Sequence, residues 1–167
     1  MRMSPEFNNQ IVHLPQYKMT NIDIIKVKEA CVDILDVKDL GELRDRFEGQ
    51  KYLDNKILII GSYLATMGFL RKPKPLLNKD SIKKTRSIVD LNGKLHDIVT
   101  CKYLEYPRLT IEQRNQPTVF IMQISENKYC FLGVGTNEIM NNDQYFKKID
   151  NEYEYFIGIT KLLQKYI

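Results

Sequence analysis

The stretch from Ser87 to Lys102 contains residues whose types could perform hydrolytic chemistry. Asp90, His96, Asp97 and Lys102 lie among apolar residues, on both sides of a predicted turn. A metal-dependent nuclease needs two carboxylates close enough to share Mg²⁺, and a lysine beside them to polarise the attacking water. The residue types therefore allow a nuclease site, and their spacing has to decide whether one forms.

The turn in this stretch is Asn92-Gly93, which predicts a β-hairpin because a type I′ turn needs positive φ at both central residues. With a two-residue loop, Ile88 lies opposite Asp97. The second arm alternates, so that Val99 faces away from His96. We therefore expect a hairpin with polar residues on a solvated face.

The spacing of the acids and the lysine does not complete a nuclease motif. With this register Lys102 is more than about 20 Å from Asp90, at about 3.3 Å per residue. The residue two before Lys102 is Thr100, and an acid is needed there. A divergent magnesium nuclease that uses Asp90 or Asp97 with Lys102 stays open as a second alternative, because a bulge or a longer loop would change the pairing.

Cysteine and histidine offer no better site. Cys31, Cys101 and Cys130 stand far apart without metal-ligand spacing, and an odd number suits a reducing compartment. His13 and His96 cannot supply a histidine-rich metal centre. Cys101 and His96 are five residues apart on one predicted strand, so their side chains point to opposite faces. We expect no metal, no cofactor and no catalytic residue.

The strongest functional signal is a basic connector, residues 71–86. It has one acid, Asp80, and carries a net charge of +6, whereas the whole chain carries +4. Its basic residues are Arg71, Lys72, Lys74, Lys79, Lys83, Lys84 and Arg86. Such clusters neutralise phosphates and release counterions. The competing interpretation is an ordinary solvated loop.

The residues after the hairpin extend this signal. Lys102, Tyr103, Tyr106, Arg108 and Arg114 combine cations with rings that could stack on bases. We therefore expect DNA or RNA as the partner, bound through these residues and the basic connector.

Helical periodicity characterises the N-terminal half. Residues 1–19 show no clear period and are expected to form an arm or tail, followed by one α+β domain over residues 20–167. A first helix is predicted from Asn21 to about Leu35. A second begins after Asp36, with Val37, Leu40, Leu43 and Phe47 on one face, and ends at Gly49. A third runs from about Leu53 to Leu70, although "KILIIG" could instead be a strand.

Strands dominate the second half. "TVFIMQI" and "YCFLGVGT" flank "SENK", which predicts a second antiparallel hairpin in the same sheet. Both arms are apolar on both faces, as in central strands that are covered by helices. Helically spaced apolar residues then predict a closing amphipathic helix: Tyr155, Phe156, Ile159, Leu162, Leu163 and Tyr166. The expected fold is α+β, with a helical half, two antiparallel hairpins in one sheet and this last helix.

The order of elements over residues 20–106 resembles the winged helix-turn-helix pattern. The resemblance implies that the third helix enters the major groove and that the hairpin contacts the DNA backbone. Base contacts would come from Asn55, Lys56, Tyr63 and Thr66. The third helix departs from the pattern because it is too apolar for an exposed recognition face.

Location and function class follow from these observations. No apolar run approaches the roughly 20 residues that span a bilayer, and the N-terminus lacks the apolar core of a signal peptide. We therefore expect a cytoplasmic, intracellular protein without a membrane partner. The leading hypothesis is a non-catalytic nucleic-acid-binding protein. The alternative is a protein-interaction module, such as an inhibitor or regulator, and the sequence leaves the oligomeric state open.

Overall fold

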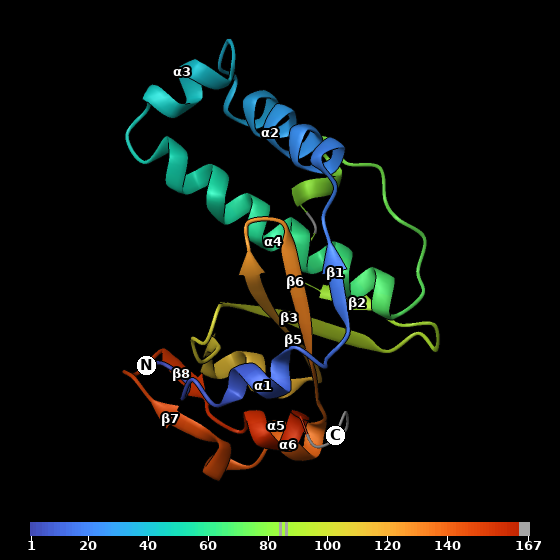
Figure 1. Cartoon of the computed structure of the whole chain (residues 1–167), viewed down its shortest axis with the longest axis vertical. Coiled ribbons are helices and arrows are strands. Elements are labelled where there is room, and N and C mark those ends of the chain that lie inside the picture. The colour runs from blue at the N-terminus through green and yellow to red at the C-terminus, as the bar shows by residue number, and fades with distance from the viewer. Residues whose placement is uncertain (84, 86, 164–167) are drawn as a thin grey trace.

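Two hydrophobic cores lie on opposite faces of a mixed β-sheet (Figure 1). This arrangement is seen in a computed structural model, which describes residues 1–83, 85 and 87–163. Within these residues, a main sheet has five strands in the order β1-β6-β5-β3-β2, and a second sheet has three in the order β4-β8-β7. The strands are β1 (Gln16–Lys18), β2 (Ser87–Val89), β3 (Leu95–Lys102), β4 (Arg108–Thr110), β5 (Thr118–Ser125), β6 (Lys128–Gly135), β7 (Phe146–Lys148) and β8 (Tyr153–Phe156). The chain is therefore an α+β protein, as predicted.

The helices form two groups. The α-helices are α1 (Phe7–Ile11), α2 (Asn21–Leu35), α3 (Leu40–Asp45), α4 (Gly49–Phe69), α5 (Asn137–Met140) and α6 (Ile159–Leu163), and the 3₁₀ turns are η1 (Ser81–Lys83), η2 (Ile111–Asn115) and η3 (Asp143–Tyr145). α4 covers one face of the main sheet and α2 packs on α4, while α1, α6 and the second sheet cover the other face (Figure 1). No helix in the described part of the chain has the length and hydropathy needed to cross a membrane.

Both predicted hairpins form, and both lie in the main sheet. β2 pairs with β3 and β5 with β6, each antiparallel, and the hairpins meet through the parallel pair β3–β5. Along β5, Val119 and Ile121 enter one core while Phe120 and Met122 enter the other. β5 and β6 are central strands, as expected, but helices alone cover only the α4 face, since the second sheet contributes to the cover of the other. The overall arrangement matches only in part, because the main sheet also contains β1 and a second sheet exists.

The first hairpin has a longer loop than the predicted type I′ turn. The N–H of Gly93 donates to the carbonyl of Asp90 at 3.1 Å, and Gly93 has φ +82°. This geometry is a type I turn followed by a left-handed residue, which is the usual three-residue connection. Ile88 consequently lies opposite His96, one residue away from the predicted partner Asp97.

The first 19 residues do not form the expected arm. β1 pairs with β6, and Ile11, Leu14 and Met19 are buried. A three-residue strand is too short to show a period, so these apolar residues carried no readable pattern.

The first helix has the predicted bounds, but its capping residue differs, and the next two helices begin at other residues than predicted. The hydroxyl oxygen of Thr20, and not the side chain of Asn21, accepts the first-turn N–H of α2, from Asp23 at 3.1 Å. α3 begins after Asp39, whose carboxylate accepts the N–H of Glu42 at 2.9 Å. Gly49 starts α4 where a helix stop was predicted.

The apolar run in the middle of the chain is the helix α4, and the strand alternative is wrong. At the other end, the predicted closing helix is only partly present. Tyr155 and Phe156 lie in β8, Ile159, Leu162 and Leu163 belong to α6, and Tyr166 lies outside the described residues.

Tyr129 of β6 joins α4 to the sheet. Its fully buried hydroxyl donates to the carbonyl of Ile57 at 2.8 Å. Its ring lies against Gly61, where an added Cβ would stand 2.0 Å from the Tyr129 Cζ. Only glycine allows this approach, so the position of α4 depends on one missing side chain.

We predict that Gly61→Ala destabilises the protein by at least about 2 kcal/mol, because the buried ring has to move and its hydrogen bond is lost. Urea denaturation measures the change. Gly68→Ala in the same helix is the matched control, since its Cβ would meet the Tyr17 ring at an ordinary 3.7 Å. That substitution should be neutral or stabilising by up to about 1 kcal/mol. Equal stability of both variants would contradict the account.

Candidate functional site

The basic connector runs from the end of α4 past α2 and returns to β2 (Figure 1). Leu77 and Ile82 fix it to the core beneath α2 and α4, where both are buried. The Asn78 side chain accepts the N–H groups of Asp80 and Ser81 at 3.0 and 2.9 Å, where the 3₁₀ turn η1 begins. The connector is therefore a packed part of the fold.

Two lysines of the connector have partners within the protein. Lys74 forms an ion pair with Asp23 at 2.5 Å, and the Asp23 side chain is only 3% exposed. The Lys72 ammonium donates to the carbonyl of Val89 in β2. Both cations hold the connector to neighbouring elements, so they are less available to a ligand than their charge indicates.

The other cations of the connector differ in setting. Lys79 and Lys83 are exposed and have no side-chain partner among the described residues. Arg71 is also exposed and adopts the left-handed conformation, with φ +57°. Lys84 and Arg86 lie outside the described residues.

The predicted residues after the hairpin lie on another part of the molecule. The hydroxyl of Tyr103 donates to the side-chain oxygen of Asn8, and Tyr106 packs against the core beneath the second sheet. The Arg108 guanidinium stacks on the ring of Tyr153, 4.1 Å from its centroid. These rings are engaged in packing on the side of the main sheet opposite α4.

Arg114 is the centre of a structural network. Its guanidinium donates to Asp143 at 2.7 Å and to Glu154 at 3.4 Å, and its Nε donates to the carbonyl of Met140 at 3.0 Å. The same group lies 3.9 Å from the ring centroid of Phe146. These contacts join η2, α5 and the second sheet and leave little of the cation for a phosphate.

The residues of the nuclease alternative are not brought together. The Asp90 carboxylate accepts the N–H groups of Asn92 and Lys94, and these bonds lower the pKa of Asp90. Asp97 and Lys102 stand at positions of opposite parity on β3, so their side chains leave opposite faces of the sheet. No cluster of three or more His, Cys, Asp or Glu residues suited to a metal ion occurs in the described residues.

The remaining candidates for nucleophilic chemistry are buried. Cys31, Cys101 and Cys130 are all free thiols in the interior. Burial raises the pKa of Cys31 to about 11 and of Cys130 to about 12, and raises that of Cys101 further. His96 is buried as well, so it does not lie on the solvated face that the sequence predicted. Its Nδ1 is 3.1 Å from the carbonyl of Lys94.

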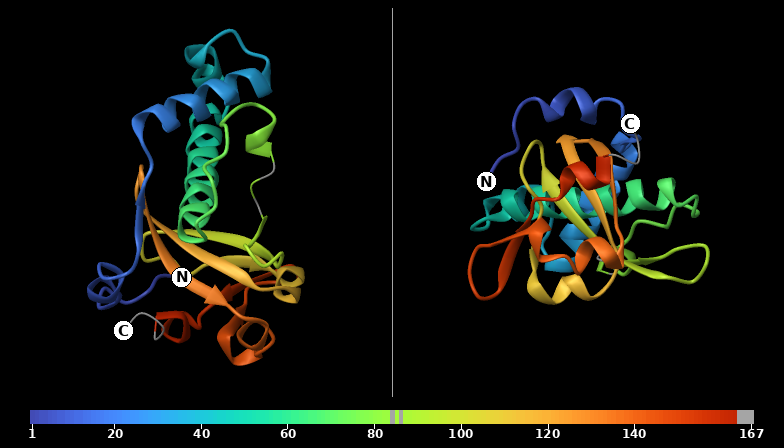
Figure 2. Two further views of the ribbon diagram at one scale, coloured as in Figure 1. Left: turned by 90° about the vertical axis from the view of Figure 1, so that its right-hand side faces the viewer. Right: turned by 90° about the horizontal axis from the view of Figure 1, so that it is seen from below.

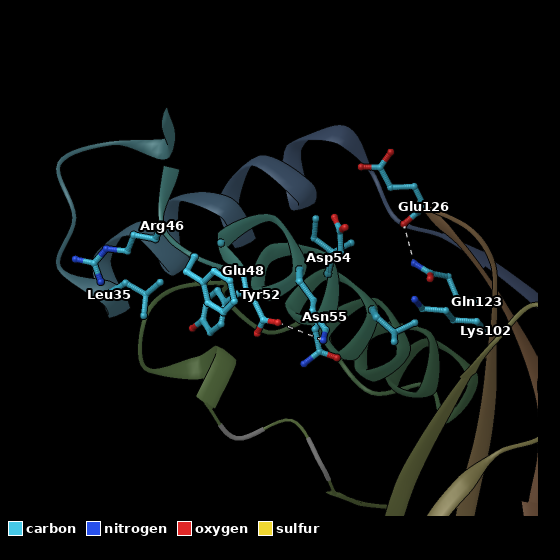
Figure 3. A pocket seen from close by; sticks show the side chains of 14 residues that line it. Leu35, Arg46, Glu48, Tyr52, Asp54, Asn55, Lys102, Gln123 and Glu126 are labelled. Carbon is cyan, nitrogen blue, oxygen red and sulfur yellow. Dashed lines mark hydrogen bonds and ion pairs between the residues drawn. The ribbon is translucent and has the colours of Figure 1, made fainter. Parts of the chain in front are cut away.

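Lys102 instead contributes to a large concave site beneath α4, which we call the α4 trough (Figure 3). The N-terminal half of α4 forms one side, and the ends of β3 and β5 form the other. Its volume is about 970 Å³. It is lined by Leu35, Arg46, Phe47, Glu48, Gly49, Lys51, Tyr52, Asp54, Asn55, Ile57, Leu58, Lys102, Gln123 and Glu126.

The apolar lining of the trough on the α4 side includes Tyr52, Ile57 and Leu58. Burial raises the pKa of the Tyr52 hydroxyl, which therefore stays neutral at pH 7. Phe47 stands on the rim with 96% of its surface exposed. It was predicted to lie in the second helix, on one face with Leu40 and Leu43, but α3 ends at Asp45 and places it in the following loop.

The polar groups of the rim carry both signs of charge. Lys51 pairs with Glu48 at 3.8 Å, and the Asp54 carboxylate accepts the amide of Gln50 at 2.8 Å. At the opposite wall, the Gln123 amide donates to the carbonyl of Glu126 at 3.3 Å. Lys102 and Arg46 have no side-chain partner among the described residues. The trough therefore offers an apolar surface between separated charges.

The fold also tests the winged-helix resemblance. In that pattern α4 would be an exposed recognition helix, whereas here it packs on β3, β5 and β6. Of its four predicted base-contacting residues, Thr66 is fully buried and donates its hydroxyl to the carbonyl of Ser62. Asn55 is exposed, and Lys56 and Tyr63 are half-buried, so the four residues do not share one exposed face.

Comparisons with known proteins provide no family: no family model, no curated protein and no solved structure matches the chain.

We predict that Lys74→Ala lowers the free energy of unfolding by about 1–3 kcal/mol, since it leaves the buried carboxylate of Asp23 without its partner. Lys79→Ala is the control and should change stability by less than about 0.5 kcal/mol, because that side chain is exposed. Thermal and urea denaturation of both variants decide whether Lys74 is structural. Equal stabilities of the two variants would show that the ion pair of Lys74 does not stabilise the fold and that its ammonium is available to a ligand.

Proposed function

We propose that the protein is a non-catalytic binding protein that takes a segment of another protein into the α4 trough. One observation carries the proposal: a phenylalanine with 96% of its surface exposed stands at the rim of an apolar cavity. Aromatic side chains beside desolvated pockets supply much of the binding energy of protein interfaces. A concave, largely apolar site with a few polar groups is also the usual form of a binding pocket.

The charges of the trough favour a protein over a nucleic acid. Glu48, Asp54 and Glu126 line it together with the three cations, so phosphates would meet repulsion as well as attraction. A polypeptide can match such a rim with its own acidic and basic side chains. Its apolar side chains would cover Tyr52 and Leu58 and contact Phe47.

The trough is built on rigid elements, which supports binding without prior folding. Its long wall is α4, which Tyr129 fixes to the sheet, and its opposite wall is the end of the β5–β6 hairpin. A preformed site loses less conformational entropy on association than a mobile site does. An inhibitor or regulator would gain affinity from this rigidity. An intracellular location belongs to the same proposal and is supported by the three free cysteines.

The experiment is selection of linear peptides displayed on phage against the whole protein, followed by affinity measurement in solution. We predict that Phe47→Ala weakens the selected peptides by at least about tenfold, or 1.4 kcal/mol. Lys102→Glu on the opposite wall should weaken them as well. Leu91→Ala is the control, since Leu91 is 69% exposed at the tip of the first hairpin.

Two outcomes would overturn the proposal. Either no peptide is enriched, or the enriched peptides bind Phe47→Ala and Leu91→Ala as tightly as the unmodified protein. Circular dichroism checks that each variant is folded, which is expected because all three side chains are exposed.

Nucleic-acid binding through the basic connector is the second candidate function. The observation in its favour is that Lys79 and Lys83 are exposed beside η1 without a partner in the described part of the chain. We predict that, if the connector binds phosphates, Lys79→Glu with Lys83→Glu abolishes binding to DNA or RNA at low salt. Affinity should also fall steeply as salt rises.

These two lysines give a cleaner test than Lys72 and Lys74, whose replacement would also disturb the fold. A filter-binding or polarisation series with mixed single- and double-stranded probes provides the measurement. Absence of binding at low salt, or binding that the double variant leaves unchanged, would remove this candidate.

A further inference from the structure

The outer face of α2 carries an apolar stripe that the fold leaves uncovered. Ile22 and Ile25 are 65% and 54% exposed. Val32 lies two turns further along the same face and is half-buried at the edge of the core. The opposite face of the helix, with Val27 and Cys31, is buried in the core. One face of α2 therefore packs in the core of its own chain, and a second face presents apolar side chains at the surface.

This face lies at an accessible end of the molecule. Figure 2 shows α2 and α3 at the end of the molecule opposite α5 and α6, with α4 on their inner side. The α4 trough does not include Ile22, Ile25 or Val32. Leu35, at the C-terminal end of α2, does line the trough.

The surface beside the stripe has the shape of a ridge between two hollows. One hollow, of about 500 Å³, lies between α2 and the β5–β6 turn. The other, of about 560 Å³, lies between α2 and α3 and is lined by Val32 and Leu40. Ile25 and Lys28 line both hollows and form the ridge that separates them.

The charges of α2 are arranged unevenly along the helix. Lys26 and Lys28 lie in its N-terminal half. Glu29 and Asp33 follow, and with Asp39 of α3 they line the second hollow. A second helix that ran in the opposite direction with the same charges would place its lysines against these acids.

We infer that this face joins two copies of the chain, with α2 of one copy antiparallel to α2 of the other about a two-fold axis. In a two-fold interface, a contact between one residue of the first copy and another residue of the second copy is repeated with the copies exchanged, so every contact occurs twice. The register that centres the stripe places Ile25 opposite Val32 of the second copy, inside its second hollow. The same register places Lys28 opposite Glu29 of the second copy.

The unequal charges give the pairing its direction. Parallel helices in register would bring Lys28 against Lys28 and Glu29 against Glu29, which is unfavourable. The antiparallel arrangement replaces both repulsions with two attractions. The occupant that fits the face best is therefore an identical copy.

The first measurement is the mass of the whole chain in solution by sedimentation equilibrium over a range of concentrations. We predict a reversible increase toward twice the 19.7 kDa of one chain. Ile25→Glu should raise the dissociation constant at least about tenfold. Val12→Glu is the matched control, because Val12 has the same 54% exposure on a different face and should leave the dimer unchanged.

Charge exchange tests the direction of the helices. The Lys28→Glu variant and the Glu29→Lys variant should each be monomeric. In a dimer of either variant, residues 28 and 29 of the two copies would carry charges of the same sign and lie opposite each other. An equimolar mixture of the two should restore association, since both contacts then pair opposite charges. The chain with both substitutions should also dimerise. All these residues lie at the surface, and circular dichroism confirms that each variant folds.

Three results would overturn the inference. The unmodified chain could stay monomeric at its highest soluble concentration. A dimer could form that Ile25→Glu does not weaken, which would place the interface elsewhere. Finally, a monomeric chain whose selected peptides are lost on Ile25→Glu would assign this face to a different protein. None of the substituted residues Ile25, Lys28 and Glu29 lines the α4 trough, so the two proposals can fail separately.

Discussion

The contact between Tyr129 and α4 is the constraint on which the architecture depends. A phenolic ring can lie directly against a helix only where the helix has no side chain, and Gly61 provides that place. The hydroxyl then finds its partner in the carbonyl of Ile57, so a buried polar group is satisfied. Ser62 and Thr66 solve the same problem within the helix by donating to carbonyls four residues earlier. The C-terminal half of α4 is thus fixed to the sheet. Its N-terminal half extends beyond the sheet and forms one side of the trough.

Elements that carry their own signal were predictable from the chain. The long apolar run of α4, the first helix and the two hairpins all have periodicity or turn residues that act locally. β1 has three residues, and its pairing with β6 depends on residues far away in sequence. The second sheet has the same character, since β4, β7 and β8 are each three or four residues long. Local patterns cannot specify such pairs.

The candidate site was not predictable for a related reason. The trough combines Phe47, Tyr52 and Gln123, which belong to separate elements and have no motif in common. The spacing of Phe47 was misleading, because a large apolar side chain at helical spacing normally faces the core, whereas Phe47 is exposed. Charge counting had a similar limit, since a cluster of lysines looks the same whether or not its members are bound. Arg114 illustrates this, as its cation joins Asp143, Glu154 and the Phe146 ring within the fold.

The pairing of β1 with β6 has a consequence for synthesis of the chain. Gln16 lies opposite Cys130, so the ribosome releases the first strand long before its partner exists. α2, α3 and α4 contact one another and can assemble early, whereas β1 cannot pair until β6 has been synthesised. During that interval Tyr17 and Met19 have no sheet to cover them. The emerging chain therefore passes through a stage at which an unpaired strand and an incomplete core are open to chaperones, or to aggregation.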